Sequence, residues 1–121
     1  MVVTARRVSF GMGRKYHNKP TITNVSGTPE KFASLREADR YRDLLILLKA
    51  DRIRNLERQV PFRIEVGGKL VCKYLADFVY DEYQGGNWVH IVEDVKGFMT
   101  PVYRLKKKLM AACLNIDIRE V

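Results

Sequence analysis

The stretch Val92-Glu93-Asp94-Val95-Lys96-Gly97 places two acids and a lysine directly after the apolar run of residues 88–92. This run predicts a buried strand, and successive side chains of a strand point to opposite faces of its sheet. Asp94 and Lys96 are therefore expected to share one face, while Glu93 points to the other. Charged groups in an interior strand are costly unless they are paired or bound to a metal. The stretch therefore predicts a site that other parts of the chain complete.

The composition is that of one globular domain with its own core, since 46% of the 121 residues are hydrophobic and 30% are charged. No apolar run approaches the ~20 residues of a membrane span, and residues 1–7 lack the apolar core of a signal peptide. These features predict a cytoplasmic protein without a membrane partner. The net charge of +8 favours a polyanionic partner such as nucleic acid.

The two cysteines, Cys72 and Cys113, lie far apart in sequence. They are expected to be small buried hydrophobic residues rather than a disulfide. His17 and His90 are the remaining candidate zinc ligands, and the four residues show no zinc-site spacing. A zinc site is not expected.

Residues 1–27 carry five cationic residues and no acidic one. We expect a flexible basic arm that lies along a phosphate backbone, and a solvated tail without a specific role is the alternative. The candidate DNA contacts in this arm are Arg14, Lys15 and Lys19.

The first expected helix covers residues 34–49. Ser34 and Glu37 have the spacing of a capping box, and Thr28-Pro29 offers an earlier start for the helix. The expected inner stripe consists of Leu35, Ala38, Tyr41, Leu45 and Leu48.

A strand-rich section follows and predicts an antiparallel meander. Gly67-Gly68 is expected to form a tight hairpin turn. The expected strands cover residues 53–59, 61–66, 69–80 and 88–96, with a turn over residues 81–87.

The second expected helix starts at Thr100-Pro101, with Thr100 as N-cap. Its expected inner face consists of Val102, Leu105, Leu109, Ala112 and Cys113, and its basic residues, which are candidate DNA contacts, are Arg104, Lys106, Lys107 and Lys108. Residues 116–121 alternate as a final strand. The order helix, strands, helix, strand predicts an α/β (α+β) fold over residues 28–121, a mixed sheet flanked by helices.

Three elements carry acids that can converge. Asp77 lies in a strand that is hydrophobic on both faces, and Asp94 and Lys96 lie in the strand expected to pair with it. Glu37 lies in the first turn of the first helix. Carboxylates on neighbouring strands can hold Mg²⁺, and a lysine beside them can stabilise the charge that develops on a phosphate. The set is suited to phosphodiester hydrolysis.

Four stretches resemble the PD-(D/E)XK nucleases, in particular the phage endonuclease I type Holliday-junction resolvases and related small phage and prophage proteins. They are Ser34-Leu-Arg-Glu-Ala, Tyr74-Leu-Ala-Asp-Phe, Val92-Glu-Asp-Val-Lys-Gly and Arg104-Leu-Lys-Lys-Lys-Leu. The resemblance covers the chain from about residue 30 onward and does not include the basic arm.

The resemblance implies a restriction-endonuclease-like core with Asp77 and Asp94 as metal ligands and Lys96 as the catalytic lysine. It implies Glu37 as an additional acid, the main-chain carbonyl of Val95 as a further ligand, and Mg²⁺ as cofactor, with Mn²⁺ able to replace it. The chain departs from the family at two positions. Ala76 stands where proline is usual, and Asp94 is shorter than the usual glutamate. With Glu93 beside it, the choice of metal-binding acid stays open.

The function expected from the resemblance is that of a phage or prophage type, metal-dependent DNA endonuclease that acts in a bacterial host cell. The resemblance further implies branched DNA as a candidate substrate and a homodimer as a candidate assembly. The alternatives are an inactive DNA-binding accessory protein of the same fold and a metal-dependent RNase. Structural roles also stay open: Glu37 as a capping residue, Asp77 and Lys96 as members of ion pairs, and Glu93 as the partner of a basic residue on the opposite face. Gln59 is a further candidate for contact with the site.

Overall fold

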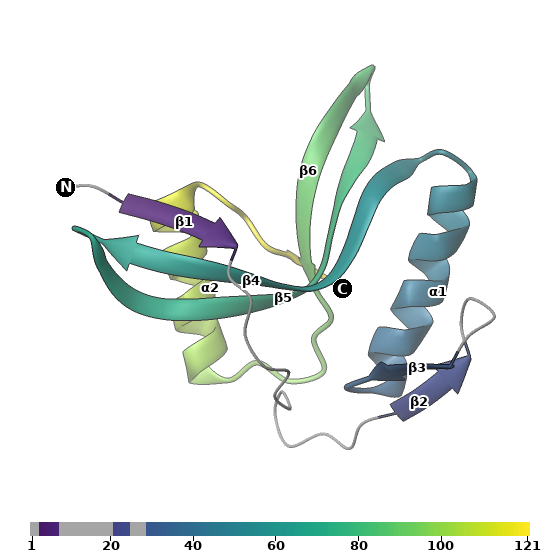
Figure 1. Cartoon of the computed structure of the whole chain (residues 1–121), viewed down its shortest axis with the longest axis horizontal. Helices are drawn as coiled ribbons and strands as arrows, with labels where there is room; N and C mark the ends of the chain where they lie inside the picture. The colour runs from purple at the N-terminus through teal and green to yellow at the C-terminus, as the bar shows by residue number, and fades with distance from the viewer. Residues whose placement is uncertain (1–2, 8–20, 25–28) are drawn as a thin grey trace.

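The fold is built on one five-stranded mixed sheet and two helices, shown in Figure 1. The computed structural model describes residues 3–7, 21–24 and 29–121. In chain order the elements are β1 (Val3–Arg7), β2 (Thr21–Asn24), β3 (Pro29–Phe32), α1 (Leu35–Lys49), β4 (Ile53–Val66), β5 (Lys69–Gln84), β6 (Asn87–Asp94), α2 (Pro101–Leu114) and β7 (Arg119–Glu120).

The strand order of the main sheet is β1-β4-β5-β6-β7. The first three pairings are antiparallel and the pairing of β6 with β7 is parallel. The strands β2 and β3 form a separate antiparallel pair beside the start of α1 (Figure 1). The expected α+β class, the mixed sheet and the meander β4-β5-β6 are confirmed.

The strands β4 and β5 are long, with 14 and 16 residues, and they extend across the whole molecule in Figure 1. Gly67 and Gly68, both at positive φ, form the predicted turn between them. Two expected boundaries are wrong. Residues 53–66 form one strand, because Val60 and Pro61, at the expected break, pair with Ala76 and Leu75 of β5. The turn expected over residues 81–87 is also shorter, since β5 continues to Gln84.

Two hydrophobic clusters form the core, one under each helix. The first joins α2 to β4, β5 and β6 through residues that include Ile64, Ala76 and Met110. The second joins α1 to the other half of the same strands through Leu44 and Phe78. Figure 1 shows α2 against the half of the β4–β5 hairpin nearest β1, and α1 along the opposite half. The sheet passes from one cluster to the other near the middle of β4 and β5.

Helix α1 begins as predicted, with Ser34 as N-cap. Its Oγ accepts a hydrogen bond from the backbone N–H of Glu37 at 3.2 Å. The predicted inner stripe is partly wrong, because Leu44 is buried while Leu35 is 65% exposed. The alternative start at Thr28-Pro29 is wrong as well, since Pro29 begins β3.

Helix α2 begins as predicted at Pro101, where Thr100 Oγ1 accepts from the backbone N–H of Tyr103 at 3.0 Å. Its predicted inner face is largely wrong. Tyr103 and Met110 are buried, whereas Val102 and Leu105 are 62% and 59% exposed. The helix has apolar residues on two sides, and periodicity alone does not show which side contacts the sheet.

The expected buried run of residues 88–92 is buried only in its second half. Trp88, Val89 and His90 are exposed, and burial begins at Ile91. The cause is visible in Figure 1, where β6 and the end of β5 extend beyond both helices. The strand β6 ends at Asp94, so Val95 and Lys96 follow it rather than belong to it, and β7 is limited to Arg119–Glu120.

Two segments of the expected N-terminal arm are strands. Residues 3–7 pair with β4 and residues 21–24 pair with β3. The candidate DNA contacts Arg14, Lys15 and Lys19 lie outside the described residues.

The two cysteines are free thiols, as predicted, although Cys72 and Cys113 are half-buried rather than buried. No helix in the described part of the chain is both long and apolar enough to cross a membrane.

The orientation of α2 predicts unequal effects of two alanine substitutions in the same helix. Met110→Ala should lower the free energy of unfolding by about 2–5 kcal/mol, because Met110 is fully buried. Leu105→Ala should change it by less than about 0.5 kcal/mol, because the side chain is exposed. Urea denaturation measures both values. Equal losses would contradict the orientation in which Met110 faces the core and Leu105 faces solvent.

Candidate functional site

Asp94 is the buried centre of the candidate site. Its side chain has no exposed surface, and its two carboxylate oxygens contact different partners. Oδ1 lies 3.1 Å from Lys96 Nζ, and Oδ2 accepts a hydrogen bond from the Tyr74 hydroxyl at 2.5 Å. Burial, together with the neighbouring Asp94 carboxylate, raises the pKa of Tyr74 well above its usual value. Tyr74 therefore remains a hydrogen-bond donor to Asp94 at any physiological pH.

Asp77 reaches the same place because of the register of β5 with β6. Phe78 pairs with Glu93, so the next step of the ladder brings Asp77 beside Asp94. Asp77 is buried, and its Oδ2 accepts from the backbone N–H of Val95 at 2.8 Å. The hydrogen bond fixes the backbone between Asp94 and Lys96 against the neighbouring strand.

Gln59 connects Asp77 to Glu37. Arg58 pairs with Phe78 and Val60 with Ala76, so Gln59 lies opposite Asp77. Its Nε2 donates to Glu37 Oε1 at 2.5 Å and lies 3.5 Å from Asp77 Oδ1. Sequence analysis gave Gln59 only as a candidate contact, and the structure places it between the two acids.

The backbone of Gln59 is unusual for a residue within a strand. Its φ is 51°, in the left-handed region that non-glycine residues seldom adopt. Such strain costs roughly 1–3 kcal/mol and is typical of positions whose side chain has a specific task. At Gln59 the strained backbone carries the amide that joins Glu37 to Asp77.

Lys96 is buried and lies between the sheet and α2. Its Nζ is 3.6 Å from the centre of the Tyr103 ring, a cation–π contact. Its backbone N–H donates to the carbonyl of Val121 at 3.0 Å, and the N–H of Val121 donates to the carbonyl of Asp94 at 3.1 Å. The segment after β6 is thus held in place by the residue after β7, although Lys96 is outside the strand.

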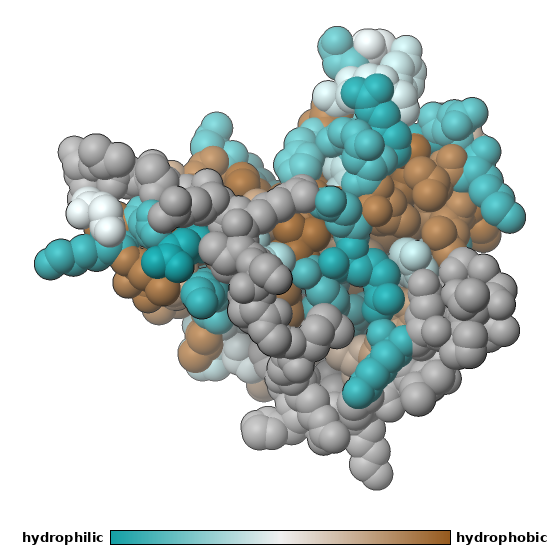
Figure 2. All heavy atoms as spheres, in the orientation of Figure 1, coloured by the Kyte–Doolittle hydropathy of each residue, from teal (hydrophilic) through white to brown (hydrophobic). Residues whose placement is uncertain are grey.

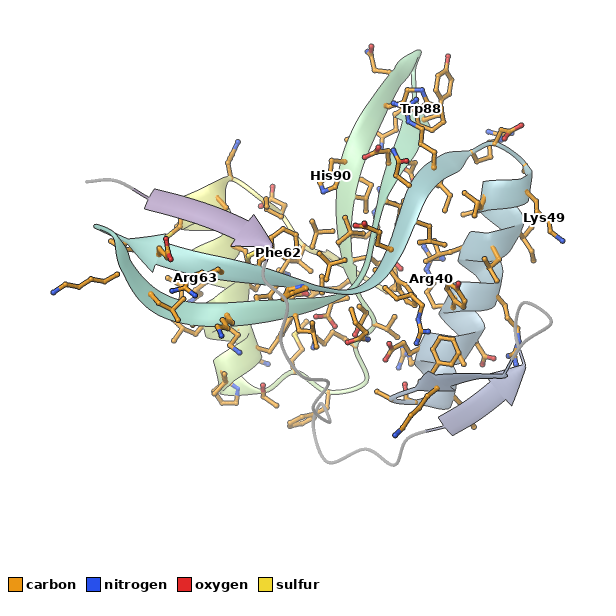
Figure 3. All side chains as sticks on the ribbon, viewed as in Figure 1. Arg40, Lys49, Phe62, Arg63, Trp88 and His90 are labelled. Atoms are coloured by element: carbon orange, nitrogen blue, oxygen red, sulfur yellow. The ribbon has the colours of Figure 1, made fainter. Side chains whose placement is uncertain are left out.

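Glu93 points the opposite way, as the alternation predicted. Arg40 of α1 donates two hydrogen bonds to its carboxylate, at 2.8 and 2.9 Å, and the Tyr80 hydroxyl donates a third at 2.7 Å. Figure 3 shows Arg40 on the side of α1 that faces the sheet. The hydrogen bond to Glu93 raises the pKa of Arg40, and burial, reinforced by the hydrogen bond to Glu93, raises the pKa of Tyr80 to about 12. Glu93 is therefore engaged on the α1 side, away from Asp94.

The acids and the lysine expected from the sequence are therefore connected. Glu37, Asp77 and Asp94 supply three carboxylates and Lys96 one ammonium group, a formal charge of −2 when all four are ionised. Oxygen ligands of this kind suit a hard divalent cation such as Mg²⁺ or Mn²⁺.

Asp77 and Asp94 are two carboxylates of the type that binds Mg²⁺. In the described segments, no three His, Cys, Asp or Glu side chains are gathered as a ready-made metal cage. Mg²⁺ is usually bound through one or two carboxylates, with waters and substrate phosphates completing its shell. Asp77 and Asp94, with the main-chain carbonyl of Val95 between Asp94 and Lys96, are the groups that match this pattern.

Three basic residues of α2 line a pocket that includes none of the site acids and not Lys96. Arg104, Lys107 and Lys108 line a pocket of about 360 Å³ together with Asp117 and Ile118. Lys107 is partly committed, since its Nζ donates to Glu120 at 2.7 Å. Lys106 is half-buried and is not part of the pocket lining.

The family model described as "Protein of unknown function (DUF1064)" matches residues 14–119. The chain belongs to this family. The match includes Glu37, Asp77, Asp94 and Lys96. No curated protein and no solved structure gives a significant match to this DUF1064 protein.

Three partners were missed in the sequence: Tyr74, which contacts Asp94, Tyr103, which contacts Lys96, and Arg40, which contacts Glu93 outside the site. Tyr74 reaches Asp94 although it lies 20 residues away in the chain. The spacing of Arg40 three residues after Glu37 is a usable signal, because residues three apart lie on one side of a helix. No comparable pattern identifies Tyr74 or Tyr103, whose contacts depend on the bend of the sheet.

The Glu93–Arg40 pair predicts a large cost when one partner is removed. Arg40→Met should lower the free energy of unfolding by about 3 kcal/mol, at the lower end for a buried pair because Arg40 keeps 24% exposure. Arg42→Met in the same helix should cost less than about 1 kcal/mol, because its pair with Asp39 is exposed. Combining Arg40→Met with Glu93→Leu should recover much of the loss. Thermal unfolding tests the set, and an Arg40→Met variant as stable as Arg42→Met would contradict it.

Proposed function

We propose that this protein is a metal-dependent DNA endonuclease that hydrolyses phosphodiester bonds, with a restriction-endonuclease-like core. One observation carries the proposal: hydrogen bonds, an ion pair and the backbone N–H of Val95 link five residues of separate elements, Glu37 of α1, Gln59 of β4, Asp77 of β5, Asp94 of β6 and Lys96 after β6. A structural role explains any one of these ion pairs taken alone. The convergence of three acids and a lysine at a strand end supports a chemical role.

The proposed roles follow from the positions of the side chains. Asp77 and Asp94, with the carbonyl of Val95, would hold a divalent cation, which would neutralise charge on the scissile phosphate and lower the pKa of a bound water. Tyr74 and the N–H of Val95 orient the two carboxylates. Lys96 stabilises the additional negative charge that develops on the phosphate. Glu93, engaged by Arg40, is assigned a structural role.

Glu37 is the additional acid of the site. Gln59 fixes it near Asp77, where it is placed to orient a water or to serve a second cation. Ser34 Oγ accepts its hydrogen bond from the backbone N–H of Glu37, so this cap leaves the Glu37 carboxylate available to Gln59.

The substrate proposed is DNA, with branched DNA as the favoured form on the resemblance to junction resolvases. The basic surface of α2 supports a phosphate-binding role, because Arg104 and Lys108 gather beside one pocket. A homodimer is the proposed assembly, because a junction has two strands to cut and each protomer would cut one. The support for the dimer is the same resemblance to junction resolvases.

Asp94→Asn should abolish cleavage while leaving the fold and DNA binding largely intact. The test incubates supercoiled plasmid and a synthetic four-way junction with Mg²⁺, Mn²⁺ or EDTA. Wild-type protein should cut at least one substrate with either metal and neither in EDTA. Asp43→Asn, an exposed acid on α1, is the matched control and should cut as wild type does.

Asp77→Asn is a second test of the carboxylates. It is needed because Asp94→Asn also removes the ion-pair partner of buried Lys96. Lys96→Met should reduce the rate by about 10²- to 10³-fold, the scale of losing one group directed at developing charge. Circular dichroism and thermal unfolding verify that each variant is folded. Absence of cutting by wild-type protein in every metal would refute the proposal, and folded Asp77 and Asp94 variants with wild-type rates would refute the site.

DNA binding should weaken steeply with salt if phosphate contacts dominate, by a slope of about −0.9 in log K against log salt for each contact. Replacing Arg104 and Lys108 with Gln should make the slope less steep by roughly 1 to 2. Lys49→Gln is the control, since Lys49 is an exposed lysine at the far end of α1 in Figure 3. Fluorescence anisotropy with labelled duplex in EDTA measures the slopes. Equal slopes for all three proteins would exclude α2 as the DNA contact.

A further inference from the structure

The end of the β5–β6 hairpin carries an aromatic and cationic cluster that the proposed site does not use. In Figure 2 this end extends clear of the rest of the molecule, and in Figure 3 Trp88 is near its tip with His90 further along the same strand. Gly85 and Gly86, both at positive φ, form the turn. The position allows contact with a large partner without movement of the core.

The cluster lies on one face of the hairpin. Tyr83 pairs with Trp88, and Asp81 pairs with His90, so all four side chains share a face. The rings of Tyr83 and Trp88 meet edge to face, with centres 5.3 Å apart. The guanidinium of Arg54, on neighbouring β4, lies 4.2 Å from the centre of the Trp88 ring.

The aromatic rings remain accessible despite these contacts. Trp88 is 37% exposed and Tyr83 is 51% exposed, although each is large enough to fill a core position. The Asp81 carboxylate accepts from Asn55 at 2.8 Å, contacts His90 at 3.0 Å and lies 3.8 Å from Arg54 Nε. Arg54 is thus a half-exposed cation that Asp81 holds beside an accessible ring. An aromatic face beside a cation suits a nucleic-acid base and the phosphate attached to it.

The cluster also shares a face of the sheet with the proposed site. Alternation along β6 puts Trp88, His90, Val92 and Asp94 on the same side. Trp88 and Asp94 are six residues apart, or about 20 Å at the usual rise per residue. A base at Trp88 is therefore too far from Asp94 to belong to the bond that is cut. Contact at the hairpin would select the substrate rather than take part in the chemistry.

We propose that the tip of the β5–β6 hairpin is a stacking platform for an unpaired DNA base, with Trp88 as the stacking ring and Arg54 as the cation for the adjoining phosphate. DNA that offers an unpaired base next to a duplex, such as a flap or an open branch, then contacts the hairpin tip and the proposed cleavage site at the same time. The proposal rests on the proposed function for the identity of the substrate class. Its own content is the preference for an unpaired base.

Trp88 is the only tryptophan of the chain, so its fluorescence reports on the platform directly. Wild-type protein in EDTA is titrated with three DNAs. The first is single-stranded oligo(dT). The second is a duplex whose ends are closed by loops, each loop paired to a complementary clamp strand so that no base is unpaired, and the third is the same duplex with a three-nucleotide flap. We expect quenching by oligo(dT) and by the flap, and little by the closed duplex. Absence of quenching by oligo(dT) or flap at concentrations where labelled DNA is bound would overturn the proposal.

Variants separate stacking from hairpin stability. Trp88→Leu should weaken binding of labelled flap DNA by about 5- to 150-fold, the loss of one base–aromatic stack, while closed duplex changes by less than about twofold. Trp88→Phe should retain part of the affinity. Val89→Ala is the matched control, because Val89 is equally exposed but points to the opposite face. Wild-type flap affinity in a folded Trp88→Leu variant would overturn the proposal.

The outcome is distinguishable from failure of the proposed function. Binding is measured in EDTA, where no cleavage takes place. A protein that quenches with oligo(dT) but never cuts retains the platform and loses the nuclease assignment. A protein that cuts DNA with the Asp94 dependence above, yet treats flap and closed duplex alike, retains the nuclease assignment and loses the platform.

Discussion

The register between β5 and β6 is the constraint on which the site depends. One arrangement of this ladder puts Asp77 beside Asp94 and directs Glu93 to Arg40 on the other side. A slip of one residue would exchange the faces of all side chains in β6. Glu93 would then lie on the side of Tyr74, and Asp94, with its shorter side chain, would lie on the side of Arg40. The two-residue turn at Gly85-Gly86 specifies the observed register, because both residues have the positive φ that such turns require.

The sequence predicted those features that depend on a few neighbouring residues. The caps at Ser34 and Thr100, the turn at Gly67-Gly68 and the opposite directions of Asp94 and Glu93 are all local consequences of side-chain chemistry or alternation. The grouping of Asp94 with Lys96 was also predicted, although β6 ends before Lys96 and a backbone pairing with Val121 keeps it in place.

The features that were not predictable depend on which surfaces meet. Val102 and Leu105 have the periodicity of an inner face, yet Tyr103 and Met110 fill the space under the sheet. Trp88 is a large aromatic residue of a type expected in the interior, but it lies where no helix covers the sheet. The contact of Tyr74 with Asp94 likewise needs the bend of β5, which no spacing in the sequence encodes. Propensity and pattern describe an element, whereas packing depends on its neighbours.

Gln59 and Asp77 lie where the sheet leaves the core cluster under α2 and enters the one under α1. Glu37 belongs to the α1 half, while Lys96 contacts Tyr103 of the α2 half. The acids and the lysine thus lie where the two cores meet, on strands that both cores share, with left-handed Gln59 at the meeting point. The spacing of Glu37 from Asp94 and Lys96 therefore depends on how both helices dock on the sheet, and a substitution in either core should alter it.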